Sequence, residues 1–386
     1  MIAKGIRVDF LTTGVVLFIL ITIHNSSQFG ASLSWMLPGC LLITVGSFIN
    51  TYPKVNACPL SILVFWLTIF LSTLASSVVP LEQDVFSFAI FLLTYYLVAR
   101  IDFSKSHIRF FKSIYICSAL VVAFAVIRNW MVGDYYISWT LRASYRFLGE
   151  NKDPNYVTAY IVPAAFYLFL QTLYAKKFKQ RCLYLTGLLV YLVAILCTGS
   201  RAPVLSLASA IGVYYIMDNS VSNSKRLGIL IIGGGIVYAL YRIYMMVMPE
   251  QVFDRIANSA EDSRLDLWKA GIRGFTESPI LGSGLNSSNY LSNIYAGNHC
   301  HNVYIDAIAS CGLFGMIFMV YFIHQNCFKS TSANNKFILA SGLAFLIPLF
   351  FINGFNSATF LMPLMMMTMF SHYCRKAGSH YGDLFE

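Results

Sequence analysis

The amino-acid sequence predicts an all-α, polytopic membrane protein with about 12 transmembrane helices. Of its 386 residues, 57% are hydrophobic and only 11% are charged, whereas a soluble domain carries about 25% charged residues. The apolar residues gather into runs whose lengths approach the ~20 residues that a helix needs to cross a bilayer. Basic residues fall mainly in the short segments between these runs, which is typical of membrane proteins.

The apolar runs predict twelve spans in order along the chain. Their approximate residues are 10–23, 32–49, 59–76, 84–99, 111–132, 156–174, 182–198, 203–217, 227–247, 302–323, 336–353 and 355–371. Lys4 and Arg7 precede the first run as in a signal peptide, but no small-residue cleavage site follows, so we expect this run to be the first span. The chain, 1–386, is then expected to be a single membrane domain.

Loop charges orient the predicted bundle. With the N-terminus inside, the inner segments hold 17 of the 27 basic residues, and 11 of those 17 are lysine. The positive-inside rule therefore places both termini in the cytoplasm. Eight of the ten outer basic residues are arginine, whose planar and permanent charge suits it to grip phosphate oxygens.

Two predicted outer segments are long, at about 133–155 and about 248–301, and long loops in compact proteins often carry function. In the second, Ser263 and Asp266 fit a capping box that opens a helix. Leu265, Trp268, Ile272 and Phe275 then recur at helical spacing. We expect a short helix on the outer membrane surface, ended by Pro279 and the turn 282–284.

Several classes of protein and of site are disfavoured. No basic patch with interleaved aromatic residues lies outside the spans, so we expect no nucleic acid as a partner. The nine cysteines are scattered and mostly inside apolar runs, which predicts neither a disulfide framework nor a metal site. The sequence lacks a Walker loop, a Rossmann fingerprint, a G-x-S-x-G elbow and a zinc motif. No cofactor is expected.

Three outer positions are candidates for chemistry. Arg264 falls in the first turn of the predicted surface helix, where free N–H groups already favour an anion; it could equally pair with a neighbouring acid or a headgroup. Arg201 lies in a very short connection near the hydrocarbon boundary. A charged side chain there either has a function or extends its charged group to the membrane–water interface. His301 precedes the tenth span and could exchange a proton near neutral pH, with His299 as its competitor.

A second set of polar residues could bind the sugar part of a substrate. The segment 149–155 is dense in polar groups, although it would also suit a solvated turn. Glu82 and Asp84 suggest a metal-binding acid pair only weakly, because acids are common in a first helical turn. The candidates for substrate binding are Arg142, Arg146, Glu150, Lys152, Asp153, Arg242, Arg273, Asn302 and Tyr304.

Taken in order, these segments resemble the O-antigen ligase and polymerase superfamily of bacterial cell-envelope polysaccharide assembly. The resemblance is carried by Arg201 in its short outer turn, Arg264-x-x-x-Trp268, the segment 279–284, His301-Asn-Val-Tyr304 and Cys311-Gly-Leu-Phe-Gly315. The motifs cover roughly 145–315, and their order and spacing are more specific than any of them alone.

The resemblance implies a GT-C-like glycosyltransferase in the bacterial cytoplasmic membrane, with its active site on the outer face. Its donor would be a glycan on undecaprenyl pyrophosphate, its acceptor another glycan, and its neighbours membrane lipids, a flippase and chain-length regulator proteins. Carried onto this sequence, Arg201 and Arg264 would hold the pyrophosphate, and His301 would assist the acceptor hydroxyl. No metal is implied.

Three functions stay open. A polymerase would join lipid-linked repeat units, whereas a ligase would move a finished glycan to lipid A core or to a protein. We favour the polymerase because the large outer segment is compact and no acceptor-binding domain is appended. A transporter or flippase of lipid-linked sugar is the alternative from another class, but the sequence lacks the repeat symmetry expected of one.

Overall fold

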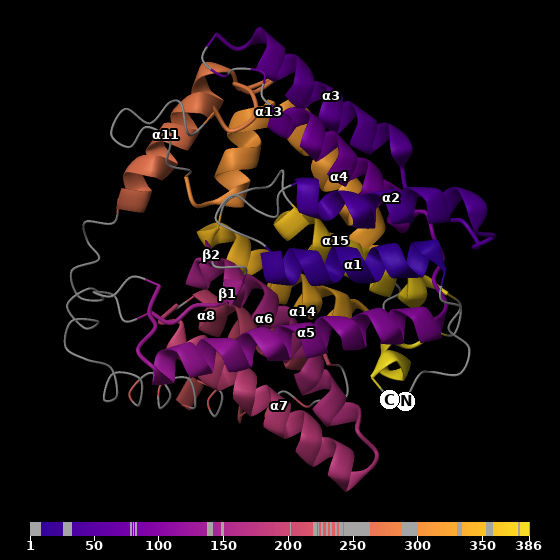
Figure 1. Ribbon diagram of the computed structural model, residues 1–386, viewed down its shortest axis with the longest axis vertical. Coiled ribbons are helices and arrows are strands. Elements are labelled where there is room, and N and C mark those ends of the chain that lie inside the picture. Colours follow the sequence, from indigo (N-terminus) through magenta and orange to yellow (C-terminus); the bar gives the residue numbers. More distant parts are fainter. Residues whose placement is uncertain are drawn as a thin grey trace. The chain divides into compact units, whose positions relative to one another are not determined.

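A computed structural model of the chain is built almost entirely of helices (Figure 1). It describes residues 9–25, 33–77, 79, 81, 83–136, 142–147, 150–200, 202–218, 263–287, 300–329, 334–352, 358–376 and 379–385, together with 222, 224, 227, 228, 231, 234, 235, 238 and 242. The prediction of an all-α fold is confirmed, and the described strands are limited to one two-residue pair.

The chain forms two compact units, each assembled from separate stretches of sequence. Unit 1 comprises Met1–Phe111, Asp262–Lys329 and Leu349–Tyr373, and unit 2 comprises Lys112–Glu261, Ser330–Pro348 and Cys374–Glu386. Of the large outer segment predicted around 248–301, the described residues 263–287 and 300–301 belong to unit 1.

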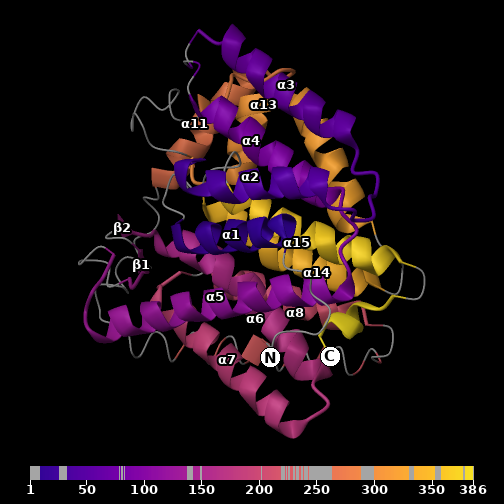
Figure 2. The same cartoon turned by 45° about the vertical axis from the view of Figure 1, so that its right-hand side comes forward.

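Unit 1 contains the first four helices, α11 from within the large outer segment, and α13 and most of α15 from the chain after it (Figure 2). Their bounds are α1 (Phe10–Asn25), α2 (Leu33–Ile49), α3 (Pro59–Ala75), α4 (Gln83–Ala99), α11 (Ser263–Glu277), α13 (Val303–Ile323) with its π-helical end η3 (His324–Phe328), and most of α15 (Ala358–Arg375). Helix α1 packs on α2, and α13 packs on both α3 and α11.

Small residues let α1 and α2 approach closely, as is common between helices in membranes. A Cβ atom placed on Gly14 would lie 2.7 Å from the main-chain nitrogen of Ile43, and one on Gly46 would lie 2.3 Å from that of Leu11. The two helices therefore meet backbone to backbone.

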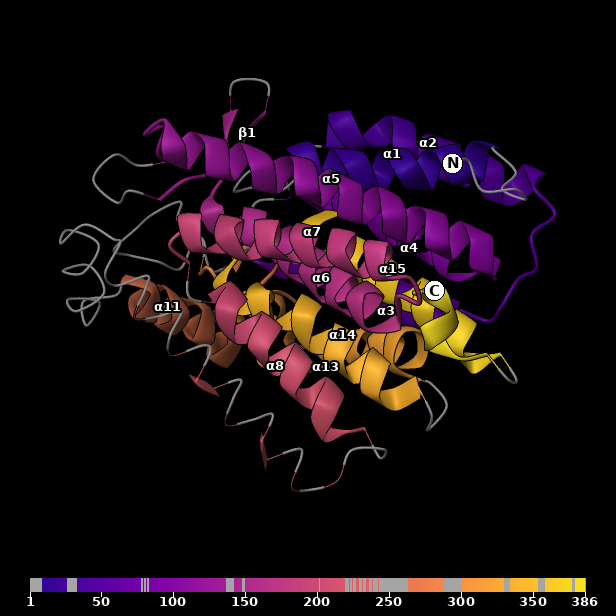
Figure 3. The ribbon, with the colours of Figure 1, turned by 90° about the horizontal axis from the view of Figure 1, so that it is seen from below.

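Unit 2 is centred on α6, which is buried along most of its length. Its elements are most of α5 (Lys105–Met131), the hairpin of β1 (Arg146–Phe147) and β2 (Glu150–Asn151), α6 (Pro154–Tyr174), α7 (Phe178–Cys197), α8 (Ala202–Ile216), α14 (Asn335–Leu346), the start of the 3₁₀ turn η5 (Ile347–Phe351) and the 3₁₀ turn η6 (Tyr381–Leu384). Helix α6 packs on α7, α8 and α14 (Figure 3).

Eleven of the twelve predicted spans correspond to observed helices within a few residues; the ninth, 227–247, lies largely outside the described residues. The fifth begins earlier than predicted, at Lys105. Four described helices are long and apolar enough to cross a membrane: Lys105–Met131, Pro154–Tyr174, Phe178–Cys197 and Val303–Phe328. Six shorter apolar helices accompany them.

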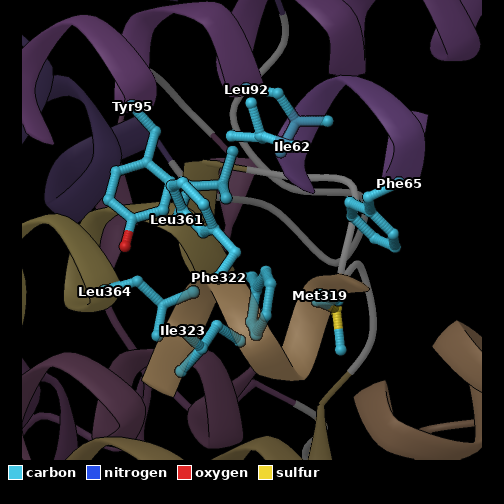
Figure 4. A pocket seen from close by; sticks show the side chains of 10 residues that line it. Ile62, Phe65, Leu92, Tyr95, Met319, Phe322, Ile323, Leu361 and Leu364 are labelled. Carbon is cyan, nitrogen blue, oxygen red and sulfur yellow. The ribbon is translucent and has the colours of Figure 1, made fainter. Parts of the chain in front are cut away.

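Unit 1 also has a small apolar pocket between α3, α4, α13 and α15 (Figure 4). Leu92, Phe322 and Leu361 are among the side chains that line it. Its one hydroxyl, that of Tyr95, is already hydrogen-bonded to Thr368 at 2.8 Å. With no charged group in its lining, the pocket cannot hold a pyrophosphate.

Candidate functional site

The start of α6 and the end of α7 are joined by a buried guanidinium. Arg142 is only 7% exposed; its Nε donates to the carbonyl oxygen of Thr198 at 2.9 Å, and one terminal nitrogen donates to Oδ1 of Asn155 at 3.0 Å. The same Oδ1 accepts from the hydroxyl of Ser200 at 2.8 Å. Arg142 and Asn155 therefore hold both sides of the turn between α7 and α8.

This turn precedes Arg201 directly in the chain. Gly199 lies in the short connection between Cys197 and Ala202. It has a left-handed φ of 62°, a conformation that costs glycine little. Arg201 itself lies outside the described residues. Pro203 falls in the first turn of α8, where proline is well tolerated.

The other candidates near β1 and β2 also have structural partners. Asp153 caps α6 by accepting from the N–H of Asn155 at 2.7 Å. Arg146 forms an ion pair with Asp134 at 2.8 Å. The side chain of Lys152 is buried, and the main-chain N–H of Lys152 donates to the carbonyl oxygen of Tyr145 at 2.9 Å. Glu150 lies in β2. A role for these residues in binding sugar stays a prediction.

Helix α11 begins at Ser263, as predicted, and carries several charged residues. Arg264 lies in its first turn, and Asp266 pairs with Lys269 at 2.9 Å. Arg273 is exposed. The side of α11 that is buried is not the predicted apolar stripe, because Leu265 and Ile272 are 54% and 51% exposed.

One leucine and three small residues form the buried side of α11 instead. Leu267 and Ala270 are buried, as are the glycines at 271 and 274, and α11 packs against α13. Leu265 and Ile272 of the predicted stripe are thus exposed, and the place of this helix on the membrane surface stays a prediction.

His301 has the most unusual backbone among the candidates. It is half-buried and has a φ of 51°, in the left-handed region that costs most L-residues roughly 1–2 kcal/mol. Residues held in such conformations cluster at functional sites. Cys300, the residue before it, is fully buried, and its thiol donates to the carbonyl of Asn302 at 3.2 Å.

The start of α13 fixes the main chain on the other side of His301. Asn302 caps the helix: its Oδ1 accepts from the N–H groups of Tyr304 at 3.0 Å and Ile305 at 3.2 Å. The Tyr304 ring lies against Phe350, with ring centroids 4.4 Å apart. Asp306 is fully buried one turn into the helix, where the helix dipole favours a carboxylate.

The structure describes only some of the remaining candidates. His299 and Glu82 lie outside the described residues, so the choice between His299 and His301 as the acting imidazole stays open. Arg242 is exposed and donates to the hydroxyl of Tyr238 at 3.3 Å. Asp84 accepts from the side-chain amide of Asn286 at 3.4 Å. Within the described ranges, no three His, Cys, Asp or Glu side chains are grouped to hold a metal ion.

Sequence reasoning did not find the role of Asn155. The residue was included in the polar segment 149–155, but nothing in its position indicated that its amide oxygen accepts from both Arg142 and Ser200. A polar residue in the first turn of a helix is usually exposed, and only the fold brings the two donors to it.

A comparison with protein families identifies the part of the chain that carries these features. The family model described as O-antigen ligase matches residues 186–320. This confirms the resemblance to the O-antigen ligase and polymerase superfamily. The match includes Arg201, Arg264 and His301, whereas Arg142 and the β1–β2 hairpin precede it. No curated protein and no solved structure matches the chain.

Proposed function

Because residues 186–320 match the O-antigen ligase family, we propose that the chain is a GT-C-like glycosyltransferase of the cytoplasmic membrane. Its donor is a glycan on undecaprenyl pyrophosphate, and transfer takes place on the outer face. The observation that supports this most is that the matched segment contains all three candidate catalytic residues and includes His301 in its left-handed conformation.

The chemistry assigns a different role to each kind of residue. The bond between the anomeric carbon and the pyrophosphate oxygen breaks, and negative charge develops on the departing diphosphate. Arg201 and Arg264 stabilise that charge, which is the part that a metal ion has in other enzymes. Fixed guanidinium groups suit this role because they present a planar fork of N–H donors to phosphate oxygens.

On the acceptor side, a hydroxyl oxygen forms the new bond to the anomeric carbon. His301 accepts the hydroxyl proton as the bond forms and later releases it to solvent. A single displacement of this kind inverts the anomeric carbon. No nucleotide and no cofactor enters the reaction.

We propose a polymerase, in which the acceptor is a second lipid-linked repeat unit that yields an O-antigen or capsule type of polysaccharide. The support for this choice is that α11 and the loop after it pack directly on α13, so the described part of the outer segment is compact. The description of the matching family favours the second candidate, a ligase that transfers finished glycan to lipid A core or to a protein.

Purified protein tests the roles of the arginines. We expect Arg264→Ala to lower turnover by roughly 10²-fold or more, because one charge-stabilising donor is worth that much. Arg264→Lys should recover only part of it, because an ammonium cannot form the bidentate contact. The assay uses lipid-linked repeat unit in a buffer with chelator and without nucleotide. Normal turnover by Arg264→Ala would remove this residue from the mechanism.

A further inference from the structure

Helix α13 is broken near its middle. Gly312 has φ of 60° and ψ of −169°, so the helix consists of a first half that ends at Cys311 and a second half that begins at Leu313. A break of this kind leaves carbonyl groups without helical partners before it and N–H groups without helical partners after it. In an apolar surrounding each such group must find another partner.

The loop after α11, residues 278–285, supplies those partners. The N–H groups of Ser283 and Gly284 donate to the carbonyls of Ala309 and Ser310 at 2.8 and 3.3 Å. In the other direction, the N–H groups of Leu313 and Phe314 donate to the carbonyls of Pro279 and Ile280 at 2.9 and 3.0 Å. The broken helix and the loop thus satisfy each other through four main-chain hydrogen bonds.

Glycine is required on both sides of this contact. A Cβ atom on Gly282 would lie 2.4 Å from the carbonyl oxygen of Ser310, and one on Gly312 would lie 2.4 Å from that of Ile280. Both glycines also have positive φ, at 82° and 60°, which side chains disfavour. We call this contact, formed by residues 278–285 and 309–314, the glycine latch.

Side chains tie the latch to two further helices. The hydroxyl of Ser283 donates to the carbonyl of Gly274 in the last turn of α11 at 2.6 Å. From α3, the hydroxyl of Ser72 donates to the carbonyl of Ser310 at 3.0 Å, and Thr73 accepts from the N–H of Leu285 at 2.9 Å. Helices α3, α11 and α13 are therefore joined at one place.

We propose that the glycine latch positions Arg264 relative to His301, with Gly282, Gly312 and Ser283 as its positioning residues. This rests on the proposed function, in which α11 carries a ligand of the leaving diphosphate and the base lies just before α13. The two groups act on opposite sides of the same anomeric carbon, so their separation must stay constant. A misplacement of about 1 Å in such an arrangement costs on the order of 10²-fold in rate.

The test counts binding-competent protein and turnover separately. Binding of free undecaprenyl pyrophosphate, measured by isothermal titration calorimetry in nanodiscs, gives the number of competent sites. Turnover of lipid-linked repeat unit is then expressed per competent site. We expect Gly282→Ala and Gly312→Ala to lower this value by about 10²-fold while the sites that remain still bind the lipid. A purely structural role would lower the number of sites and leave turnover per site unchanged.

Milder variants and a matched control complete the experiment. Ser283→Ala removes one hydrogen bond without steric conflict, and we expect a loss of about tenfold per site, restored by Ser283→Thr; this variant decides the question if the glycine variants do not fold. Gly212→Ala is the control, because a Cβ atom at this position of α8 meets nothing within 4 Å. If Ser283→Ala and Gly282→Ala keep the wild-type turnover per site, the positioning role of the glycine latch is wrong, and the proposed function is unaffected. If the wild-type protein has no transfer activity, the proposed function is wrong, and this inference fails with it.

Discussion

At the scale of single residues, His301 combines a reactive side chain with a strained main chain. Its neighbours explain why the strain is held: Cys300 is fully buried before it, and Asn302 caps α13 after it. A residue free to relax would not keep a φ of 51°, so the conformation is maintained by its two neighbours. The side chain and the backbone of this residue can be tested separately.

Three substitutions of His301 make that separation. Asparagine and glycine accept the left-handed conformation, whereas alanine does not. We expect His301→Asn and His301→Gly to keep or raise the thermal stability of the solubilised protein, and His301→Ala to lower its free energy of unfolding by about 1 kcal/mol. All three should lose glycan transfer. Transfer at the wild-type rate by His301→Asn would show that this imidazole is not the base.

Arg142 was predicted to bind substrate, but its geometry favours a positioning role. Arg142→Ala would remove the hydrogen bonds that the guanidinium donates to the carbonyl oxygen of Thr198 and to Oδ1 of Asn155. The turn before Arg201 would then no longer be held in place. We expect turnover to fall by roughly 10²-fold with little change in KM for the donor. Arg142→Lys should restore little, because one ammonium cannot span both acceptors. A large rise in KM with normal turnover would instead indicate direct contact with the substrate.

At the scale of elements, apolar periodicity was enough to predict most helices but not their interruptions. The sequence predicted one continuous span at 302–323, yet α13 breaks at Gly312. The break is stabilised by main-chain partners from 278–285, and no local pattern encodes a hydrogen bond to a distant loop. Tertiary packing also decided which side of α11 is buried: the side with Leu267, Ala270 and the glycines at 271 and 274 is buried, and not the apolar stripe that the spacing suggested.

In the candidate site, too, local patterns predicted some features, and others depended on contacts between distant parts of the chain. The order of the motifs was enough to predict the resemblance to the O-antigen ligase superfamily, and the start of α11 followed from local rules. The partners of Arg142 could not be predicted, because Thr198 lies 56 residues away in the sequence and meets it only through the packing of α6 and α7.

The segment after α15 is a second element whose packing the sequence did not reveal. Tyr381 is fully buried, its ring is stacked on Phe337 with centroids 4.9 Å apart, and its hydroxyl lies 2.9 Å from those of Tyr174 and Tyr214. Burial is the main cause of a raised pKa of Tyr381, which strengthens the ordinary preference of a tyrosine hydroxyl for its protonated form. The segment is thus fastened to unit 2 through both apolar and polar contacts.

Substituting Tyr381 tests this fastening. We expect Tyr381→Ala to lower the free energy of unfolding by about 3–5 kcal/mol, as for other large buried side chains. Tyr381→Phe should cost only about 1 kcal/mol, because it keeps the ring and loses the hydroxyl's hydrogen bonds. Thermal unfolding in detergent measures both. Equal stability of the two variants would show that the ring's packing contributes little.

At the scale of the whole molecule, loop charges predict the orientation in the membrane. Lys177, between α6 and α7, should face the cytoplasm, and Lys269, on α11, should face outward; both side chains are exposed. A membrane-impermeant maleimide applied to intact spheroplasts should therefore label Lys269→Cys above the background of the parent protein, and should leave Lys177→Cys at that background. The reverse result would invert the topology and remove the outer active site.

The most direct test of the central claim is transfer of glycan from a lipid pyrophosphate by the purified protein. The assay contains wild-type protein in nanodiscs, lipid-linked repeat unit and chelator, without nucleotide, beside His301→Asn and Arg264→Ala. A ladder of lengthened products in the wild-type reaction, missing from both variants, is the predicted result. Transfer onto an added acceptor alone would identify a ligase, and recovery of the donor without any covalent change would contradict the account.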